Sequence, residues 1–184
     1  DVHFPPSRLI CLENTHNRCF GMPLDINYIN NVADVAKDNK MLVHIDGARI
    51  FNAAVATSSS VSDLTKKVDS VSFCLSKGLS APSGSLLCGD SSFIQRARFN
   101  RKALGGGMRQ AGILAAAGIV ALTVMSKKII QDHQNAKKLS EGISKIEGIN
   151  LKLEKIKTNI IYFKLDHPKV NSKALLEYME KKNI

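Results

Sequence analysis

Two polar side chains of complementary chemistry follow apolar, strand-like segments of this sequence. Asp46 comes directly after residues 41–45, and Lys77 comes at the end of the apolar segment 68–75. The carboxyl ends of parallel strands meet at one edge of a sheet, where ligands bind. A carboxylate and an amine at two such ends can therefore share a ligand, and Asn14, after the segment 9–12, is expected at the same edge.

The surroundings of Lys77 predict an amine with a chemical role. It stands between an apolar segment and Gly78-Leu79, so we expect it to be partly buried. Partial burial lowers the pKa of a lysine and frees its amine to attack a carbonyl group. A carboxylate one strand away suits a pyridinium nitrogen, because the ion pair keeps that nitrogen protonated and the ring electron-withdrawing.

A third element suits a phosphate group. Residues 105–107 are three glycines, and Arg109 follows them at the start of a predicted helix. Backbone amides and a guanidinium at a helix start favour phosphate binding. Taken singly, these features have plainer interpretations: Asp-Gly is commonly a turn, a lone lysine lies at the surface, and a glycine run is a loop. His3, His16 and His44, taken one at a time, are more often structural.

The first half of the sequence alternates strand-like and helical segments. Residues 9–12, 41–45, 68–75 and 84–89 are typical of strands, and residues 24–39 have apolar side chains at the spacing of one helix face, with Asp25 near the start. This order predicts an α/β fold with a mostly parallel sheet flanked by helices.

The second half is predicted to be mainly helical, with a small α/β part at its end. We expect helices over 91–101, 108–124 and 127–146, then two strands and a last helix over 149–153, 160–165 and 172–182. The Ala-rich helix 108–124 is apolar on most faces, which predicts burial nearly all round. We divide the chain into part of a large domain, residues 1–130, and part of a small C-terminal domain, residues 131–184.

Composition and charge exclude several classes of protein. The 184 residues are 44% apolar with a formal net charge of +10, as in a folded domain rather than a disordered one. The basic residues are scattered in pairs without interleaved aromatics, which argues against nucleic-acid binding. The longest uncharged stretch, residues 110–126, is rich in Gly and Ala. It is shorter than the ~20 residues needed to span a membrane. We expect no membrane association.

The four cysteines indicate a reducing compartment. They form no Cys-x-x-Cys pair and lack nearby histidines at metal-ligand spacing, so no metal site is expected. Three of them, Cys11, Cys74 and Cys88, stand in apolar strand-like segments, which predicts buried free thiols. A cytoplasmic location is the expectation that follows.

Four blocks of the sequence together resemble one enzyme family. The blocks, in chain order, are Glu13 to Asn17, His44 to Arg49, Ser76 to Gly84, and Arg101 to Gly112. They resemble the low-specificity L-threonine aldolases in order and separation, and the resemblance covers residues 3–165. It implies a fold-type-I, aspartate-aminotransferase-like enzyme that depends on pyridoxal 5'-phosphate and forms a homo-oligomer, a dimer or a tetramer.

The resemblance also implies roles for individual residues. Lys77 would form the Schiff base with pyridoxal phosphate, Asp46 would bind the pyridine nitrogen, and Arg49 would bind the substrate carboxylate near the ring. Arg109 would reach the phosphate, that of the neighbouring subunit, and His3 would handle the proton of the substrate hydroxyl. The family blocks contain four further candidates with less defined roles: Ser76, Lys102, His16 and Asn14.

The implied reaction is a retro-aldol cleavage of a small β-hydroxy-α-amino acid. L-threonine or L-allo-threonine would form an external aldimine and break its Cα–Cβ bond, giving acetaldehyde and glycine, in the context of threonine catabolism and glycine formation. The family also has a Gly-Thr phosphate loop, a ring-stacking His and a small-domain Arg outside the matched blocks, so we expect a fragment whose sheet has open edges and exposed apolar faces. A truncated, non-catalytic fragment or binding scaffold, and a related β-eliminating lyase, are the alternatives.

Overall fold

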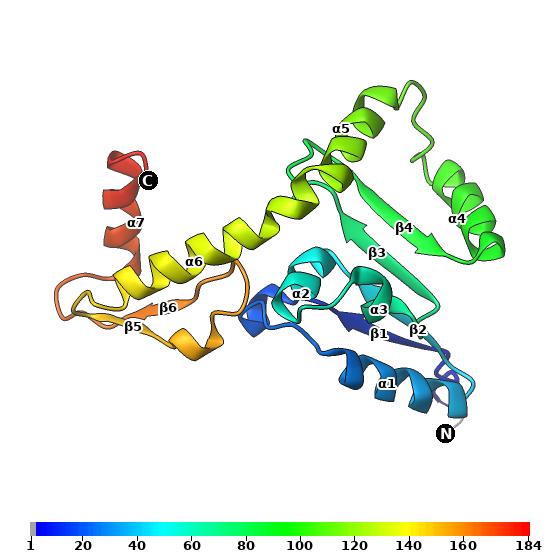
Figure 1. Ribbon diagram of the computed structural model, residues 1–184, viewed down its shortest axis with the longest axis horizontal. Helices are drawn as coiled ribbons and strands as arrows, with labels where there is room; N and C mark the ends of the chain where they lie inside the picture. Colours follow the sequence, from blue (N-terminus) through cyan, green and yellow to red (C-terminus); the bar gives the residue numbers. More distant parts are fainter. Residues whose placement is uncertain (1–2) are drawn as a thin grey trace.

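Residues 3–184 are described by a computed structural model, in which four strands form the main sheet (Figure 1). The order is β1-β2-β3-β4; β1 to β3 are parallel and β4 is antiparallel to β3. The strand bounds are β1 Leu9–Glu13, β2 Leu42–Asp46, β3 Ser70–Cys74 and β4 Ser85–Gly89. The predicted α/β class and mostly parallel sheet are confirmed.

Three helices connect the parallel strands. They are α1 Ile26–Asp38, α2 Ile50–Ala56 and α3 Val61–Thr65. The side chain of Asp25 caps α1 by accepting a hydrogen bond from Tyr28 N at 2.8 Å, which satisfies one of the unpaired amides of the first turn. Ser60 and Asp63 form a capping box on α3. These caps explain why the helices begin where they do.

The core lies on one face of the main sheet. Alternate strand residues, including Ile45, Val71 and Phe73, are buried against Ile29 of α1 and Ile50 of α2. Each fully buried Ile contributes about 1.5–3 kcal/mol to the stability of the fold. The residues of β1 and β2 that point to the other face remain exposed, Leu9 at 52% and Leu42 at 56%, so the expected exposed apolar face is confirmed.

The predicted burial of the helix over 108–124 is wrong. The helix is α5, Gly112–Thr123, and it follows α4, Ser91–Ala103. Gly118 and Ala121 are its buried residues, whereas Ile113 is 85% and Ile119 64% exposed. One side of α5 packs on the end of β3, where a methyl group on Gly118 would lie 3.2 Å from Cδ1 of Leu75. The other sides have no described neighbour to cover them.

A long helix connects this part to a second, two-stranded sheet. It is α6, Ile129–Ile143, preceded by a 3-10 turn at Met125–Lys128. Antiparallel strands β5, Ile149–Leu151, and β6, Phe163–Leu165, precede α7, Ser172–Lys181 (Figure 1). The predicted β-β-α order is therefore present, with shorter strands, and the division at residue 130 stays a prediction.

Two further expectations concern burial and membrane spans. Cys11 and Cys88 are exposed and Cys74 is partly buried, with all four thiols free. The prediction of buried thiols is therefore wrong, because Cys11 points to the uncovered sheet face and β4 is exposed along its length.

Within residues 3–184, no single helix has the length and apolarity to cross a bilayer. Helix α5 and the segment Met125–Ile143 meet that test only jointly, as a pair bent by 41°.

Candidate active site

The carboxyl ends of the parallel strands bring Asp46 to the expected edge. Asp46 is in register with Glu13 on one side and with Ser72 on the other. Its Oδ1 accepts a hydrogen bond from Ala48 N at 3.0 Å, and the side chain is exposed. The carboxylate is thus oriented by its own turn and free to meet a ligand.

Gly47 explains why this turn can lie so close to β3. Its N–H donates to the carbonyl oxygen of Ser72 at 2.7 Å. A methyl group at Gly47 would lie 2.9 Å from that oxygen and 2.9 Å from Cβ of Ile50. Glycine is therefore required for a steric reason, and the close approach fixes Asp46 relative to β3.

The turn after β3 presents Lys77 at the same edge. Leu75, Leu79 and Ala81 are buried and anchor the turn, while Ser76 and Lys77 are exposed. Ser80 N donates to Lys77 O at 2.8 Å and Ala81 N to Leu75 O at 3.0 Å. The main chain that bears Lys77 is therefore held from both sides.

The expected partial burial of Lys77 is wrong. The side chain is exposed, and within residues 3–184 its amine has no hydrogen bond or ion pair. Burial by this chain therefore does not prepare the amine for reaction, and a cofactor or another chain segment would have to cover it.

Arg49 lies close to Asp46, between β2 and α2. It is the residue that precedes the first turn of α2 and is half-buried. The turn is closed by Ile50 N, which donates to Gly47 O at 2.8 Å. Asp46 and Lys77 thus follow the carboxyl ends of β2 and β3, as predicted, and Arg49 lies on the turn after β2.

The structure does not bring Arg109 or Lys102 to this edge. Figure 1 shows the loop between α4 and α5 at the outer end of α5, away from the carboxyl ends of β1 and β2. In that loop, a methyl group on Gly107 would lie 2.5 Å from Cδ of Lys102, so the lysine stem folds over the glycine. This arrangement does not support contact between Arg109 and the phosphate of a cofactor attached to Lys77 of the same chain.

His3 is also separate from Lys77. It is exposed and lies in the segment before β1, which reaches the sheet from the edge where the strands start (Figure 1). Lys77 follows the opposite ends of the strands. Within one chain, His3 and Lys77 therefore lie at opposite ends of the strands, and the proton-handling role of His3 stays a prediction.

Asn14 and His16 have structural contacts at the edge. Asn14 is fully buried, and its side-chain amide accepts from Leu24 N at 3.0 Å and donates to Leu24 O at 3.2 Å. His16 Nε2 lies 3.2 Å from a carboxylate oxygen of Glu13. Asn14 therefore fixes the loop after β1.

A polar cluster around the buried Asn52, behind the Lys77 turn, was missed at the level of sequence. Nδ2 of Asn52 lies 3.1 Å from Nε2 of His133 and 3.1 Å from Oδ1 of Asn159. The available signal was a single asparagine within an otherwise apolar helix, residues 50–56. The partners could not be found, because they lie far away in the sequence.

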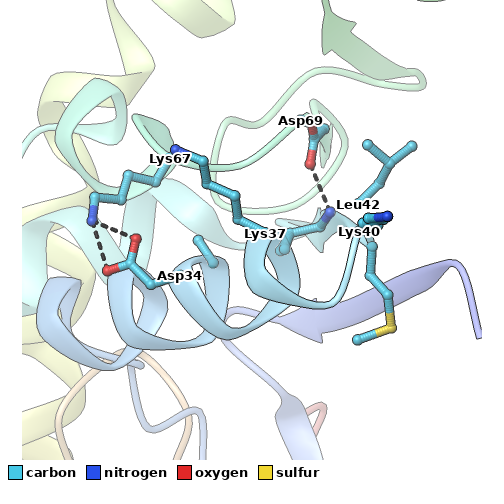
Figure 2. Close-up of a pocket in the computed structure, with 9 residues that line it drawn as sticks. Asp34, Lys37, Lys40, Leu42, Lys67 and Asp69 are labelled. Atoms are coloured by element: carbon cyan, nitrogen blue, oxygen red, sulfur yellow. Dashed lines mark hydrogen bonds and ion pairs between the residues drawn. The ribbon is translucent and has the colours of Figure 1, made fainter.

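A cavity of about 600 Å³ lies away from these residues. Figure 2 shows its lining at the start of β2, where Lys67 pairs with Asp34 and Asp69 accepts from the main chain of Val43 at 2.7 Å. It opens at the amino ends of the strands and includes none of the predicted site residues. The candidate active site is instead an open, polar edge.

Comparison with known proteins identifies the family. The beta-eliminating lyase family matches residues 1–166. This chain belongs to that family. Among solved structures of this fold, a putative aromatic amino acid beta-eliminating lyase/threonine aldolase from Exiguobacterium sp. 255-15 has a TM-score of 0.78 at 20% identity, over 85% of this chain and 44% of that one. A putative L-allo-threonine aldolase from Listeria monocytogenes has a TM-score of 0.75 at 19% identity, over 81% and 42% of the two chains.

Curated relatives of this family member are more similar in sequence. The probable low-specificity L-threonine aldolase 2 of Arabidopsis thaliana is 46% identical over 98% of the chain and 51% of its own length. The low specificity L-threonine aldolase of Escherichia coli O157:H7 is 41% identical over 100% and 53%. A protein named alanine racemase TOXG, from Cochliobolus carbonum, is 37% identical over 90% and 43%. The chain spans about half the length of the curated relatives it matches.

The residues at the edge fit pyridoxal phosphate by their chemistry. A fixed carboxylate at Asp46 can face a pyridine nitrogen, an unpaired amine at Lys77 can bond to an aldehyde, and Arg49 adds a positive charge beside them. Asp46 and Arg49 lie on the turn between β2 and α2, Lys77 lies on the turn after β3, and the main chain of both turns is hydrogen-bonded. The edge residues therefore provide a coherent donor set for this cofactor, except for its phosphate.

Proposed function

We propose that the protein containing this chain uses pyridoxal phosphate to cleave L-threonine and L-allo-threonine into glycine and acetaldehyde. The observation that carries the proposal is the placement of Asp46 and Lys77 at the ends of neighbouring strands β2 and β3. The similarity of nearly the whole chain to proteins named low-specificity L-threonine aldolase supports the choice of substrate.

Each edge residue has a role in this proposal. Lys77 would hold the cofactor through its amine, and Asp46 would keep a proton on the pyridine nitrogen. When bound, the cofactor supplies a sink for the electrons released at the substrate α-carbon. Arg49 would pair with the substrate carboxylate and so orient the Cα–Cβ bond.

Two further roles belong to the proposal for the whole protein. A base must take the proton from the substrate β-hydroxyl before acetaldehyde leaves, a step typically worth ~10²–10⁴ in rate, and we propose His3 for it on the family motif alone. Arg109 would bind the cofactor phosphate of a neighbouring subunit, since its loop lies at the outer end of α5. This requires a homo-oligomer, which we propose together with a cytoplasmic location.

The decisive experiment combines cofactor binding with product analysis. The purified protein is titrated with pyridoxal phosphate while its visible absorbance is recorded, and Lys77→Ala should remove the band that marks covalent attachment. Lys37→Ala, an exposed lysine near the amino ends of the strands, is the matched control and should keep it. Retention of the band in Lys77→Ala would overturn the assignment.

Product analysis separates the alternative reactions. Release of glycine and acetaldehyde from threonine supports the aldolase, whereas pyruvate and ammonia would indicate β-elimination. Inversion at the α-carbon of alanine would indicate the activity in the name of the Cochliobolus carbonum relative. If the 184-residue chain alone gives no absorbance band at saturating cofactor, this part is non-catalytic by itself.

A further inference from the structure

The polar cluster behind the Lys77 turn joins three distant segments. Asn52 of α2 is 2% exposed. Its Nδ2 lies 3.1 Å from Nε2 of His133, on α6, and donates to Oδ1 of Asn159, in the segment between β5 and β6, at 3.1 Å. One buried amide nitrogen thus uses both of its hydrogens to tie the main sheet to α6 and to the second sheet.

The other atom of the same amide faces the Lys77 turn. Oδ1 of Asn52 is the nearest atom, at 3.6 Å, to the position of a methyl group on Gly78, the residue after Lys77. Oδ2 of Asp132 comes next at 3.9 Å, with Cγ1 of Ile129 at the same distance. The Asn52 amide therefore lies next to the Lys77 turn at Gly78, and among the hydrogen bonds of residues 3–184 none joins the two.

The donors and acceptors of the cluster require a neutral His133. An amide nitrogen donates and does not accept, so Nε2 of His133 must accept from Asn52 and the ring proton lies on Nδ1. Burial lowers the pKa of His133, while the charge of Asp132 acts in the opposite direction. Asp132 is the charged group that acts on the ring; the groups facing it from α2 and from the segment before β6 are the neutral amides of Asn52 and Asn159.

We propose that neutral His133 is a positioning residue for Lys77, acting through the Asn52 amide on the turn at Gly78. Protonated Nε2 would be a donor opposite the donor Nδ2, so the bond would break or the Asn52 amide would turn over. Turning over moves Oδ1 away from Gly78 and leaves Oδ1 of Asn159 without its donor. Either change loosens the Lys77 turn and its link to the second sheet. The inference rests on the proposed function, because the position of Lys77 matters for catalysis only if Lys77 holds the cofactor.

The test measures the turn directly and without cofactor. Amide hydrogen exchange of Ser80 and Ala81, which donate to Lys77 O and Leu75 O, is followed in the full-length protein between about pH 5 and about pH 8, across the titration range of histidine. Rates are corrected for intrinsic exchange, and the His133 ring is titrated in parallel by NMR. We expect protection to fall by roughly fivefold as His133 gains its proton, the equilibrium effect of one lost hydrogen bond.

Two variants distinguish positioning from simple packing. His133→Gln places an acceptor at the Nε2 position without a titrating group, so protection should stay high and show no step with pH. His133→Leu removes the acceptor and should give low protection throughout. His167→Gln, in the exposed stretch after β6 where Nδ1 of His167 accepts from Lys169 N at 3.2 Å, is the matched control and should behave as the unaltered protein.

The outcomes separate this inference from the proposed function. Protection that is flat through the His133 titration, or a step that persists in His133→Gln, overturns the role of His133 even if the cofactor binds to Lys77. Failure of the cofactor to attach to Lys77 overturns the proposed function by a separate measurement, and the hydrogen-exchange pattern does not depend on it.

Discussion

Asp46 lies directly opposite Ser72 in the parallel pairing of β2 and β3, and the N–H of the next residue, Gly47, donates to Ser72 O at 2.7 Å. The carboxylate is thereby fixed to the strand that leads into the Lys77 turn. Parallel pairing places the two strand ends together, so one hydrogen-bonded contact determines how the two proposed cofactor ligands are placed.

Replacing Asp46 with Asn should reduce cleavage of threonine without abolishing cofactor attachment. The neutral amide keeps the shape of the side chain but loses the charge that holds a proton on the ring nitrogen. We expect kcat to fall by roughly a hundredfold or more, similar to the loss of one preorganised electrostatic contact. Asp166→Asn, on the exposed end of β6, should leave kcat unchanged. An Asp46→Asn protein with full kcat would contradict the role of the carboxylate.

Gly47→Ala should destabilise the fold, whereas Gly142→Ala should not. The added methyl group at Gly47 would lie 2.9 Å from both Ser72 O and Ile50 Cβ, but the one at Gly142 in α6 meets nothing within 4 Å. We expect a loss of about 1–3 kcal/mol in the free energy of unfolding for Gly47→Ala. Gly142→Ala should gain up to about 1 kcal/mol from helix propensity. Denaturant titration measures both, and equal stabilities would show that β2 and β3 can separate without cost.

Stability should fall as the pH is lowered below about 6.5, the pKa of an unperturbed histidine, because of His133. Burial lowers the pKa of His133 in the folded state, so the unfolded chain binds more protons in this window. The contribution is fully present above the unfolded pKa and is lost as the pH falls through the folded pKa. The change in Tm between neutral and mildly acidic buffer should therefore be smaller in His133→Gln. An identical pH dependence in both proteins would rule out His133 as its source.

Thr158→Val should loosen the attachment of the second sheet to the loop after β1. The buried hydroxyl of Thr158 donates to Gly21 O at 3.0 Å, and Phe20 packs edge-to-face on Tyr162 with ring centroids 5.4 Å apart. Valine leaves the carbonyl buried without a donor, at a cost of about 1–3 kcal/mol. Thr158→Ser keeps the hydroxyl and should lose less. The free energy of unfolding compares them, and the reverse order would exclude this hydrogen bond as the attachment.

Ile119→Glu should weaken self-association of the full-length protein. Ile113, Ile119 and Val120 give α5 an exposed apolar side, and large exposed apolar patches mark interaction surfaces. Analytical ultracentrifugation should show a shift toward monomer, together with weaker cofactor binding if Arg109 serves a neighbouring subunit. Gln131→Glu, at an exposed position on α6, is the control. Unchanged association of Ile119→Glu would place the contact between copies elsewhere.

Local sequence patterns were sufficient for most elements of the fold. The strand ending at Asp46, the helix capped by Asp25 and the strand bounded by Gly84 and Gly89 were all predicted, because hydrophobic periodicity and capping depend on residues that are near one another in the chain. The burial of α5 and of Cys11 was predicted incorrectly. Their exposure depends on which other segments cover them, and apolar composition carries no information about that.

The sequence by itself determined the chemistry of the edge: the types and spacing of Asp46, Arg49 and Lys77, and the family they indicate. Only the tertiary structure decided that Lys77 is exposed, that Arg109 and His3 lie elsewhere, and that Asn52 meets His133 and Asn159. Those partners are 81 and 107 residues away from Asn52 in the chain. Strand ends meet because parallel pairing forces them to, whereas contacts between distant helices and loops arise from packing of the whole chain, which no short pattern encodes.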